Sequence, residues 1–165
     1  MDKMGPADLQ AYVDQHGISG EILYLDDRTP TVEIAARAVG TRPEQIAKSI
    51  LFLIDEQPVL AITCGIAYVE RRAIAALYGV GRKRVKLASP DIVLEIAGYE
   101  VGAMPPFAHR QPLPTLIDRR VLEQPEVYAG GGAENALVRL FPQDILRVTQ
   151  ARVTDLLTVP SSQEG

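Results

Sequence analysis

The sequence predicts a compact α+β domain. Its 165 residues fit one domain, and a composition of 47% hydrophobic and 23% charged residues is typical of a globule with a sizeable core. Helical and strand patterns alternate without a steady β-α-β rhythm, which disfavours a doubly wound parallel sheet. We expect one domain over residues 1–160 and a disordered tail over 161–165.

The first predicted elements are a helix, a strand and a second helix. Apolar residues recur at helical spacing from Pro6 to His16, and Gly17 ends that helix. The segment from Glu21 to Asp26 is typical of a strand. Thr31 opens the second helix and is most simply its N-cap, and Gly40 ends it.

A short helix and a hairpin are expected next. Thr41 and Glu44 have capping-box spacing, which predicts a third helix that carries Lys48 at its end. The strands Ile50 to Ile54 and Val59 to Thr63 flank a polar turn, so they are predicted to pair as a hairpin.

The second half of the chain continues the mixture. Helices are expected where a cap or a proline precedes an apolar-periodic run, and strands where β-branched and aromatic residues gather. The predicted helices are Glu70 to Tyr78, Ser89 to Gly98, Pro142 to Leu146 and Val153 to Leu156. The predicted strands are Val85 to Leu87, Thr115 to Ile117, Glu126 to Ala129 and Leu137 to Phe141.

The segment from Gly98 to Asp118, GYEVGAMPPFAHRQPLPTLID, is the most informative part of the sequence. Four prolines and two glycines rule out a helix over most of it. It is too apolar to be a solvated linker, because residues such as Tyr99, Met104 and Phe107 would seek burial. Stiff loops that must pack commonly carry function.

Four motifs in this order resemble the YbaK and prolyl-tRNA-synthetase-associated editing domain family. They are Lys48 in QIAKSILFLI, Gly102 to Pro106 in GAMPP, Leu113 to Asp118 in LPTLID, and Gly130 to Gly132 in YAGGGAEN. Each motif alone is weak, but the ordered set spans roughly residues 6 to 157. The resemblance implies a mixed sheet curled into a partly closed barrel and flanked by helices.

The resemblance also implies a function. The expected protein is a free-standing trans-editing hydrolase that removes a small incorrect amino acid, such as alanine, from tRNA for proline. Its expected partners are the acceptor end of aminoacyl-tRNA and prolyl-tRNA synthetase. One alternative is a YbaK-type deacylase that removes cysteine by means of the substrate's own thiol. Another is a module that binds tRNA or a synthetase without turnover.

Three residues are the candidate catalytic groups. Lys48 is by default an exposed cation, but the resemblance places it in the ester pocket, where an ammonium can hold a phosphate or an ester oxygen. Gly102 would let the backbone approach the substrate so that neighbouring amides form an oxyanion site. His109 would either act as a general base or only shape the loop, and we favour shaping.

Further residues are candidates for substrate binding. Exposed amides in the triple-glycine turn would suit a ribose or a phosphate, although a simple hairpin turn is the alternative. Asp118 is a candidate carboxylate, and a structural cap is its simpler role. The full candidate set is Thr31, Ala103, Met104, Pro105, Pro106, Asp118, Gly130, Gly131 and Gly132.

Charge is distributed unevenly. The net charge of −4 argues against indiscriminate nucleic-acid binding. One stretch without acidic residues could nevertheless meet the phosphates of tRNA, or could be only a solvated face. This basic cluster consists of Arg71, Arg72, Arg82, Lys83, Arg84 and Lys86.

The remaining features exclude several classes. A single cysteine, Cys64, rules out an intrachain disulfide, and two distant histidines make a metal site improbable, so no metal or cofactor is expected. Cys64 itself is expected to be a buried small hydrophobe. No P-loop, dinucleotide fingerprint or serine-hydrolase elbow occurs. No membrane-spanning run or apolar leader is visible, so we expect a cytoplasmic protein.

Overall fold

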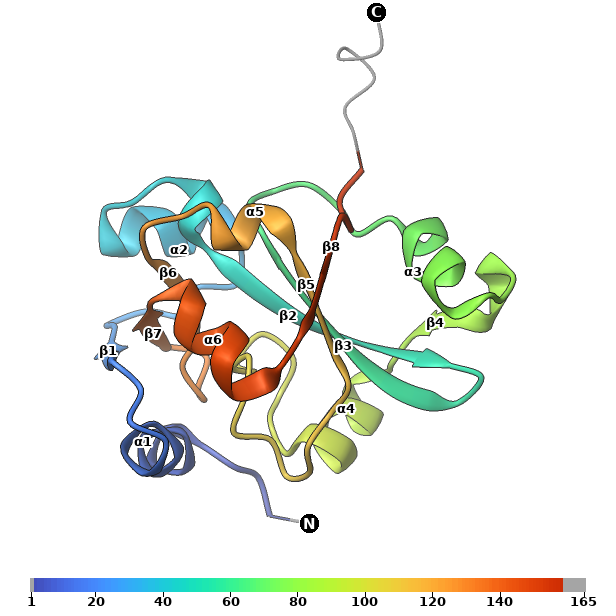
Figure 1. Cartoon of the computed structure of the whole chain (residues 1–165). Coiled ribbons are helices and arrows are strands. Elements are labelled where there is room, and N and C mark those ends of the chain that lie inside the picture. The colour runs from blue at the N-terminus through green and yellow to red at the C-terminus, as the bar shows by residue number, and fades with distance from the viewer. Residues whose placement is uncertain (1, 159–165) are drawn as a thin grey trace, which may run out of the picture.

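The computed structural model describes residues 2–158 and confirms the α+β prediction (Figure 1). In place of one continuous curled sheet, the strands form two. A three-stranded antiparallel sheet has the order β1-β7-β6, and a five-stranded mixed sheet has the order β4-β2-β3-β5-β8. An isolated bridge between Ile46 and Tyr128 connects them.

Within residues 2–158 the elements have the following bounds. The α-helices are α1 Pro6–Gln15, α2 Val32–Val39, α3 Arg71–Tyr78, α4 Pro90–Ala97, α5 Arg119–Leu122 and α6 Pro142–Thr149. The strands are β1 Gly20–Tyr24, β2 Ala47–Ile54, β3 Gln57–Cys64, β4 Val85–Leu87, β5 Thr115–Asp118, β6 Val127–Gly130, β7 Ala136–Leu140 and β8 Arg152–Thr154. Two 3₁₀ turns cover Pro43–Gln45 and Arg82–Arg84.

The predicted third helix is wrong. Only the 3₁₀ turn Pro43–Gln45 forms, because the Thr41 hydroxyl donates to the Gln45 side chain and no capping box is made. The backbone is already extended at Ile46. The apolar residues that follow pair with β3 along the whole of β2, so Lys48 is the second residue of a strand.

The predicted tail helix from Val153 to Leu156 is also wrong. These residues begin in strand β8, which pairs in parallel with β5 and places Val153 opposite Ile117. The β-branched residues of this segment complete the sheet edge, a tertiary contact that outweighs helical spacing in a short run. The expected disordered tail, residues 161–165, lies outside the described residues.

The hairpin of β2 and β3 is confirmed and organises the core. Its register runs from Ala47 opposite Cys64 to Ile54 opposite Gln57, and both turn residues, Asp55 and Glu56, have positive φ. That backbone geometry is typical of a tight hairpin turn, whose twist matches that of the strands.

Alternation along β2 gives its two faces different surroundings. Ala47 and Leu51 belong to the larger core cluster, which α1, α4 and α6 also help to form. Phe52 and Ile54 belong to a second cluster that includes Ile74 of α3. Lys48 shares the second face and Ser49 shares the first, so these two neighbours point to opposite sides of the sheet.

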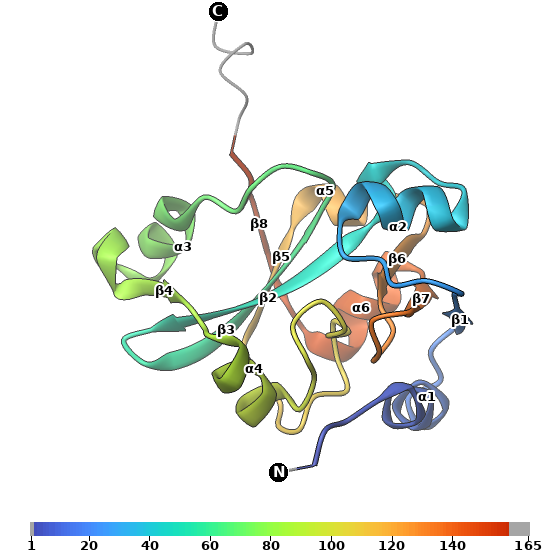
Figure 2. The same ribbon diagram turned by 180° about the vertical axis from the view of Figure 1, so that it is seen from behind.

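The two ends of β2 are also distinct. Its first residues lie near α2, and its last residues lie near α3 and β4 (Figures 1 and 2). Leu53 pairs with Lys86 of β4. Because Leu53 comes five residues after Lys48, it lies about 17 Å from Lys48 along the strand.

No helix within residues 2–158 has the length and apolar character needed to span a bilayer.

Candidate active site

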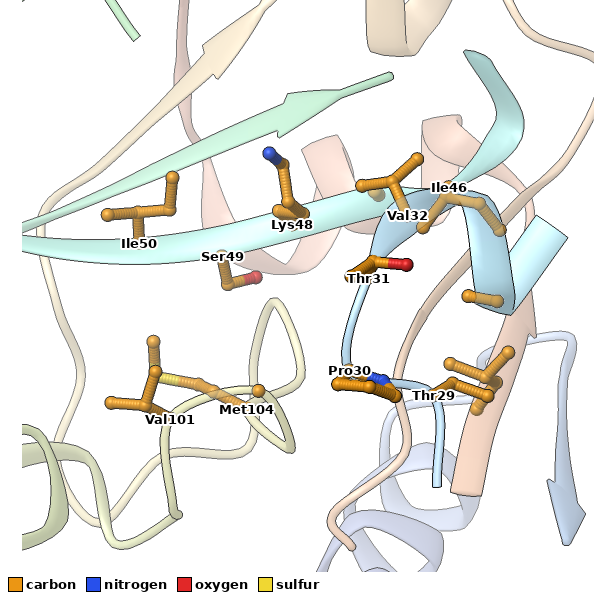
Figure 3. Close-up of a pocket in the computed structure, with 15 residues that line it drawn as sticks. Thr29, Pro30, Thr31, Val32, Ile46, Lys48, Ser49, Ile50, Val101 and Met104 are labelled. Atoms are coloured by element: carbon orange, nitrogen blue, oxygen red, sulfur yellow. The ribbon is translucent and has the colours of Figure 1, made fainter. Parts of the chain in front are cut away.

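A cavity of about 200 Å³ lies at the beginning of β2 (Figure 3). The segment before α2, strand β2, the Pro-rich loop and the sheet of β6 and β7 all contribute to its wall. The lining is mostly apolar, with a few hydroxyl groups and one cation. The residues are Thr29, Pro30, Thr31, Val32, Ala35, Ile46, Ala47, Lys48, Ser49, Ile50, Val101, Gly102, Met104, Gly130 and Leu137.

The cavity brings together five residues that were predicted from distant parts of the sequence. They are Thr31, Lys48, Gly102, Met104 and Gly130. Their convergence depends on β2, which carries the lysine between α2 and the loop after α4. Lys48 is partly buried, and no acidic group within residues 2–158 forms an ion pair with it. Its ammonium therefore remains available to an anionic ligand.

Lys48 and the loop lie on different sides of β2. In Figure 3 the Ser49 side chain points from the strand toward Val101 and Met104, whereas the Lys48 side chain extends from the other side. Thr63, directly opposite Lys48 in the register, is fully buried, and its hydroxyl has no hydrogen-bond partner within the described chain. The lysine face of the strand thus contains an unused polar atom beside the cation.

Two residues of the Pro-rich loop that line the cavity, Gly102 and Met104, have backbone amides without a recorded acceptor in the described chain. Gly102 has a φ of +89°, a conformation that glycine adopts readily and other residues do not. The Ala103 amide donates to the Glu100 carbonyl at 3.0 Å. Within residues 2–158 no acceptor is recorded for the amides of Gly102 and Met104. These two donors can therefore hold a carbonyl oxygen or an oxyanion.

The triple-glycine turn packs against this loop. A β-carbon at Gly130 would overlap the Met104 carbonyl, one at Gly131 would lie 2.7 Å from the Ala136 backbone, and one at Gly132 would lie 2.7 Å from Pro6. Each glycine therefore lets a different backbone segment approach closely.

The expectation that this turn exposes its amides to a ligand is corrected. Gly131 donates to Ala136 O at 2.9 Å, and Gly132 donates to Ala103 O at 2.8 Å. Both donors are used to hold the turn and the loop in place. Only Gly130 lines the cavity, and Gly131 and Gly132 act through packing.

Thr31 has two roles at once. Its hydroxyl accepts a hydrogen bond from the Ile34 amide at 3.1 Å, which confirms the predicted N-cap of α2. The same residue lines the cavity. Capping fixes the direction of the segment that forms one wall of the site.

His109 lies away from this cavity. Together with Pro106 it lines a separate cavity of about 140 Å³. Its Nε2 lies 2.8 Å from Pro105 O, and since a carbonyl only accepts, Nε2 carries the proton. Burial lowers the pKa of His109, although the bond to Pro105 opposes that shift. This placement favours a loop-shaping role over general-base catalysis.

The remaining predicted substrate residues are structural. Ala103 and Pro105 are buried within the loop. Asp118 is 1% exposed, and its carboxylate accepts from the amides of Arg120 at 2.9 Å and Leu156 at 2.7 Å. Asp118 thus caps α5, a short helix that the sequence pattern did not indicate, and fixes the segment after β8. It does not line the cavity.

Cys64 is buried at the end of β3, as expected. Burial, and secondly the nearby Asp118 carboxylate, raise the pKa of its thiol to about 11. The thiol is therefore protonated near neutral pH and is a poor nucleophile.

The basic cluster lies near the far end of β2 and is partly neutralised. Arg84 forms an ion pair with Asp55 of the hairpin turn. The other five residues have no ion-pair partner within residues 2–158. Of these, Arg71 and Arg72 begin α3, whereas Arg82, Lys83 and Lys86 lie in the turn before β4 and in β4 itself.

Sequence reasoning missed part of the cavity wall. Ser49, Val101 and Leu137 line it but were not candidates. Ser49 could have been found by alternation if β2 had been predicted to begin at Ala47.

The described residues contain no group of three or more His, Cys, Asp or Glu side chains arranged to hold a metal ion.

Fold and site together bring a lysine without an ion-pair partner and two backbone amides without a recorded acceptor to one largely apolar cavity within residues 2–158. Residues 26–148, more than half of the chain, match the aminoacyl-tRNA editing domain family. The chain therefore belongs to that family, and it is an enzyme of the aminoacyl-tRNA deacylase class.

Individual relatives agree with this assignment. A crystal structure of a candidate trans-editing enzyme for prolyl tRNA synthetase superposes with a TM-score of 0.86 at 32% identity, covering 93% of this chain and 97% of that one. The multifunctional Ser/Thr-tRNA deacylase ProXp-y of Escherichia coli K12 is 29% identical over 74% of this chain and 75% of its own. The uncharacterized protein YwhH of Bacillus subtilis is 23% identical over 88% of this chain and 91% of its own.

Proposed function

We propose that this protein is a trans-editing deacylase that removes a small incorrect amino acid, such as alanine, from tRNA for proline. The observation that carries this proposal is the pair of amides without acceptors, Gly102 and Met104, on the same cavity as Lys48. A likeness to a candidate trans-editing enzyme for prolyl tRNA synthetase supports the choice of tRNA. Prolyl-tRNA synthetase is accordingly the proposed partner.

In the proposed reaction, the ester carbonyl oxygen lies against the Gly102 and Met104 amides. A water molecule attacks the carbonyl carbon, forming a new C–O bond, and the amides stabilise the negative charge that develops on the oxygen. The ester bond to the ribose then breaks, and the departing ribose oxygen takes up the proton that the attacking water has lost. The products are the free amino acid and uncharged tRNA.

Lys48 performs a different task in this proposal. Because its side chain extends from the side of β2 opposite Ser49 and the loop, it is better placed to hold a phosphate than the ester oxygen. A lysine suits this role as a compact cation with three donors. Holding the terminal nucleotide at its phosphate would position the ester over the loop.

The cavity wall offers a mostly apolar surface to an acyl group. Val32, Ile46 and Leu137 supply bulky apolar surface, and the space they leave is about 200 Å³. The hydroxyls of Thr31 and Ser49 are the polar side chains that could meet the α-amino group or a hydroxylated side chain. A second site of this kind restores fidelity because a synthetase rejects an amino acid smaller by one methylene only about 10- to 200-fold.

The proposal is tested with the purified chain and tRNA for proline charged with alanine, serine, threonine, cysteine or proline. We expect hydrolysis of alanyl-tRNA well above the spontaneous rate, with prolyl-tRNA spared. Hydrolysis of the cysteinyl ester alone, lost when the thiol is methylated, would instead indicate the YbaK-type reaction. Binding of charged tRNA without turnover of any ester would leave only a binding module.

A further inference from the structure

One exposed aromatic ring has no role in the cavity or in the core. Tyr68 is 80% exposed and lies between β3 and α3, and Ile66, two residues earlier, is 62% exposed. Figures 1 and 2 both show this segment running from the end of β3 to α3. Two large side chains are thus exposed close together on one short surface segment.

The backbone of the segment is held firmly although the ring is free. The Tyr68 carbonyl accepts from the Thr158 amide at 2.9 Å, and Val69 forms a bridge with Leu157. Val69 also packs against the second core cluster, which lies on the Lys48 face of the sheet. The backbone of Tyr68 is therefore held next to a residue that packs on the Lys48 face, while its ring is exposed.

The charge beside the ring suits a nucleic acid. Arg71 and Arg72 follow within four residues, and neither forms an ion pair within residues 2–158. The adjacent Glu70 keeps its negative charge but caps α3, because its Oε1 accepts from the Arg72 amide at 3.1 Å. An exposed aromatic ring next to unpaired arginines is the arrangement that holds single-stranded RNA by stacking and phosphate contacts.

Tyr68 lies close enough to Lys48 for one RNA strand to reach both residues. Thr63 lies directly opposite Lys48, and five residues separate Thr63 from Tyr68, at most about 18 Å of chain. An RNA strand whose last phosphate lies at Lys48 can therefore continue over the segment between β3 and α3.

We propose that Tyr68 stacks on a base of the unpaired 3′ end of tRNA, and that Arg71 and Arg72 contact the adjoining phosphates. This inference rests on the proposed function for the identity of the RNA. Tyr68 is a binding residue that takes no part in the hydrolysis. Its contribution is confined to substrates that contain nucleotides beyond the terminal adenosine.

Two substrates separate this role from catalysis. Tyr68→Ala is expected to lower kcat/KM on mischarged tRNA about 5- to 150-fold, the range for removal of one stacked base. On the same amino acid esterified to adenosine alone, Tyr68→Ala should match the unsubstituted protein. Tyr68→Phe should retain activity on both, because it keeps the ring. An equal loss on both substrates, or no loss on tRNA, would overturn the proposal.

A binding measurement keeps the inference independent of turnover. The affinity for the RNA tetranucleotide ACCA is expected to fall in Tyr68→Ala and to remain unchanged in Tyr24→Ala. Tyr24 is a matched control because it is 68% exposed but lies in β1 of the other sheet. If the unsubstituted protein hydrolyses neither ester, the proposed function fails, and the tetranucleotide still decides the role of Tyr68. An unchanged affinity in Tyr68→Ala would refute it.

Discussion

The Met104 carbonyl occupies the space that a β-carbon at Gly130 would need. The loop that carries the two unused amides therefore rests directly on the backbone of β6. A second tie, the bond from Gly132 N to Ala103 O at 2.8 Å, holds the same loop. The triple-glycine turn is thus part of the site, although it contributes mainly through packing.

Gly130→Ala should destabilise the protein and impair activity together. The added methyl group meets backbone atoms that cannot rotate away, so the loop must shift, at a cost of about 1–3 kcal/mol. Urea unfolding and deacylation assays would measure both effects. Gly81→Ala is the control for stability, because a β-carbon there meets nothing within 4 Å and its φ is −72°. Normal stability and activity in Gly130→Ala would contradict the contact.

Gly102→Ala should lower stability through its backbone conformation, and activity because a β-carbon would hinder the approach of the substrate to the loop. The φ of +89° strains any residue with a β-carbon, at a cost of about 1 kcal/mol. Gly17→Ala, at a φ of +60° with open space around it, controls for this backbone cost. We expect the two variants to lose similar stability and only Gly102→Ala to lose deacylation. Equal activity in both variants would remove the loop from the reaction.

Lys48→Ala should leave a folded protein with about 10²–10³-fold lower kcat/KM on mischarged tRNA. Its melting temperature should change little, because Lys48 forms no ion pair within the described residues. Lys48→Arg should restore part of the rate, since it keeps the charge but not the shape.

The substrate can show which atom Lys48 holds. If the lysine holds the terminal phosphate, Lys48→Ala should have little effect on aminoacyl-adenosine, which lacks that phosphate. Arg37→Ala serves as the charge control, because Arg37 is an exposed cation of α2 that does not line the cavity. Normal tRNA deacylation by Lys48→Ala would refute the assignment.

Acid should destabilise the fold in part through His109. Burial lowers its folded pKa, so the unfolded chain takes up a proton near pH 6.5 while the folded protein resists. The unfolded state then binds more protons, and stability falls as pH drops below 6.5, by up to about 1.4 kcal/mol for each pH unit between the two pKa values. Melting temperatures from pH 5 to 7.5 should fall less steeply in His109→Gln. His16→Gln controls for loss of a histidine, and identical slopes in all three proteins would refute this role.

The basic cluster should affect tRNA affinity rather than the chemical step. Arg82→Ala combined with Lys83→Ala should weaken binding and reduce the salt dependence, by about 0.7 to 0.9 in the logarithmic slope for each phosphate that the variant no longer neutralises. Arg84→Ala should have a smaller effect, because Asp55 already neutralises Arg84. An unchanged slope in the double variant would make the cluster a solvated face.

Local sequence determined most elements of the fold. Thr31 and Ser89 cap the helices they were expected to open, and Gly40, Gly79 and Gly98 end three helices in the left-handed conformation. Two predicted helices were wrong: the helix before Lys48, where only the 3₁₀ turn Pro43–Gln45 forms, and the helix from Val153 to Leu156, which begins in β8. Ala47 and Lys48 are extended because they pair with β3, and Val153 is extended because it pairs with β5, a strand far away in the sequence.

The sequence by itself determined the family and the Pro-rich loop, and it singled out Lys48 and Gly102 as candidates, because each lies in a motif that depends only on neighbouring residues. Only the tertiary structure decided which candidates share a cavity. It placed His109 and Asp118 elsewhere, used the Gly131 and Gly132 amides in the backbone, and added Ser49 to the wall. The physical reason is that hydrogen-bond satisfaction and the facing of a side chain depend on strand register and close packing, which chain neighbours do not specify.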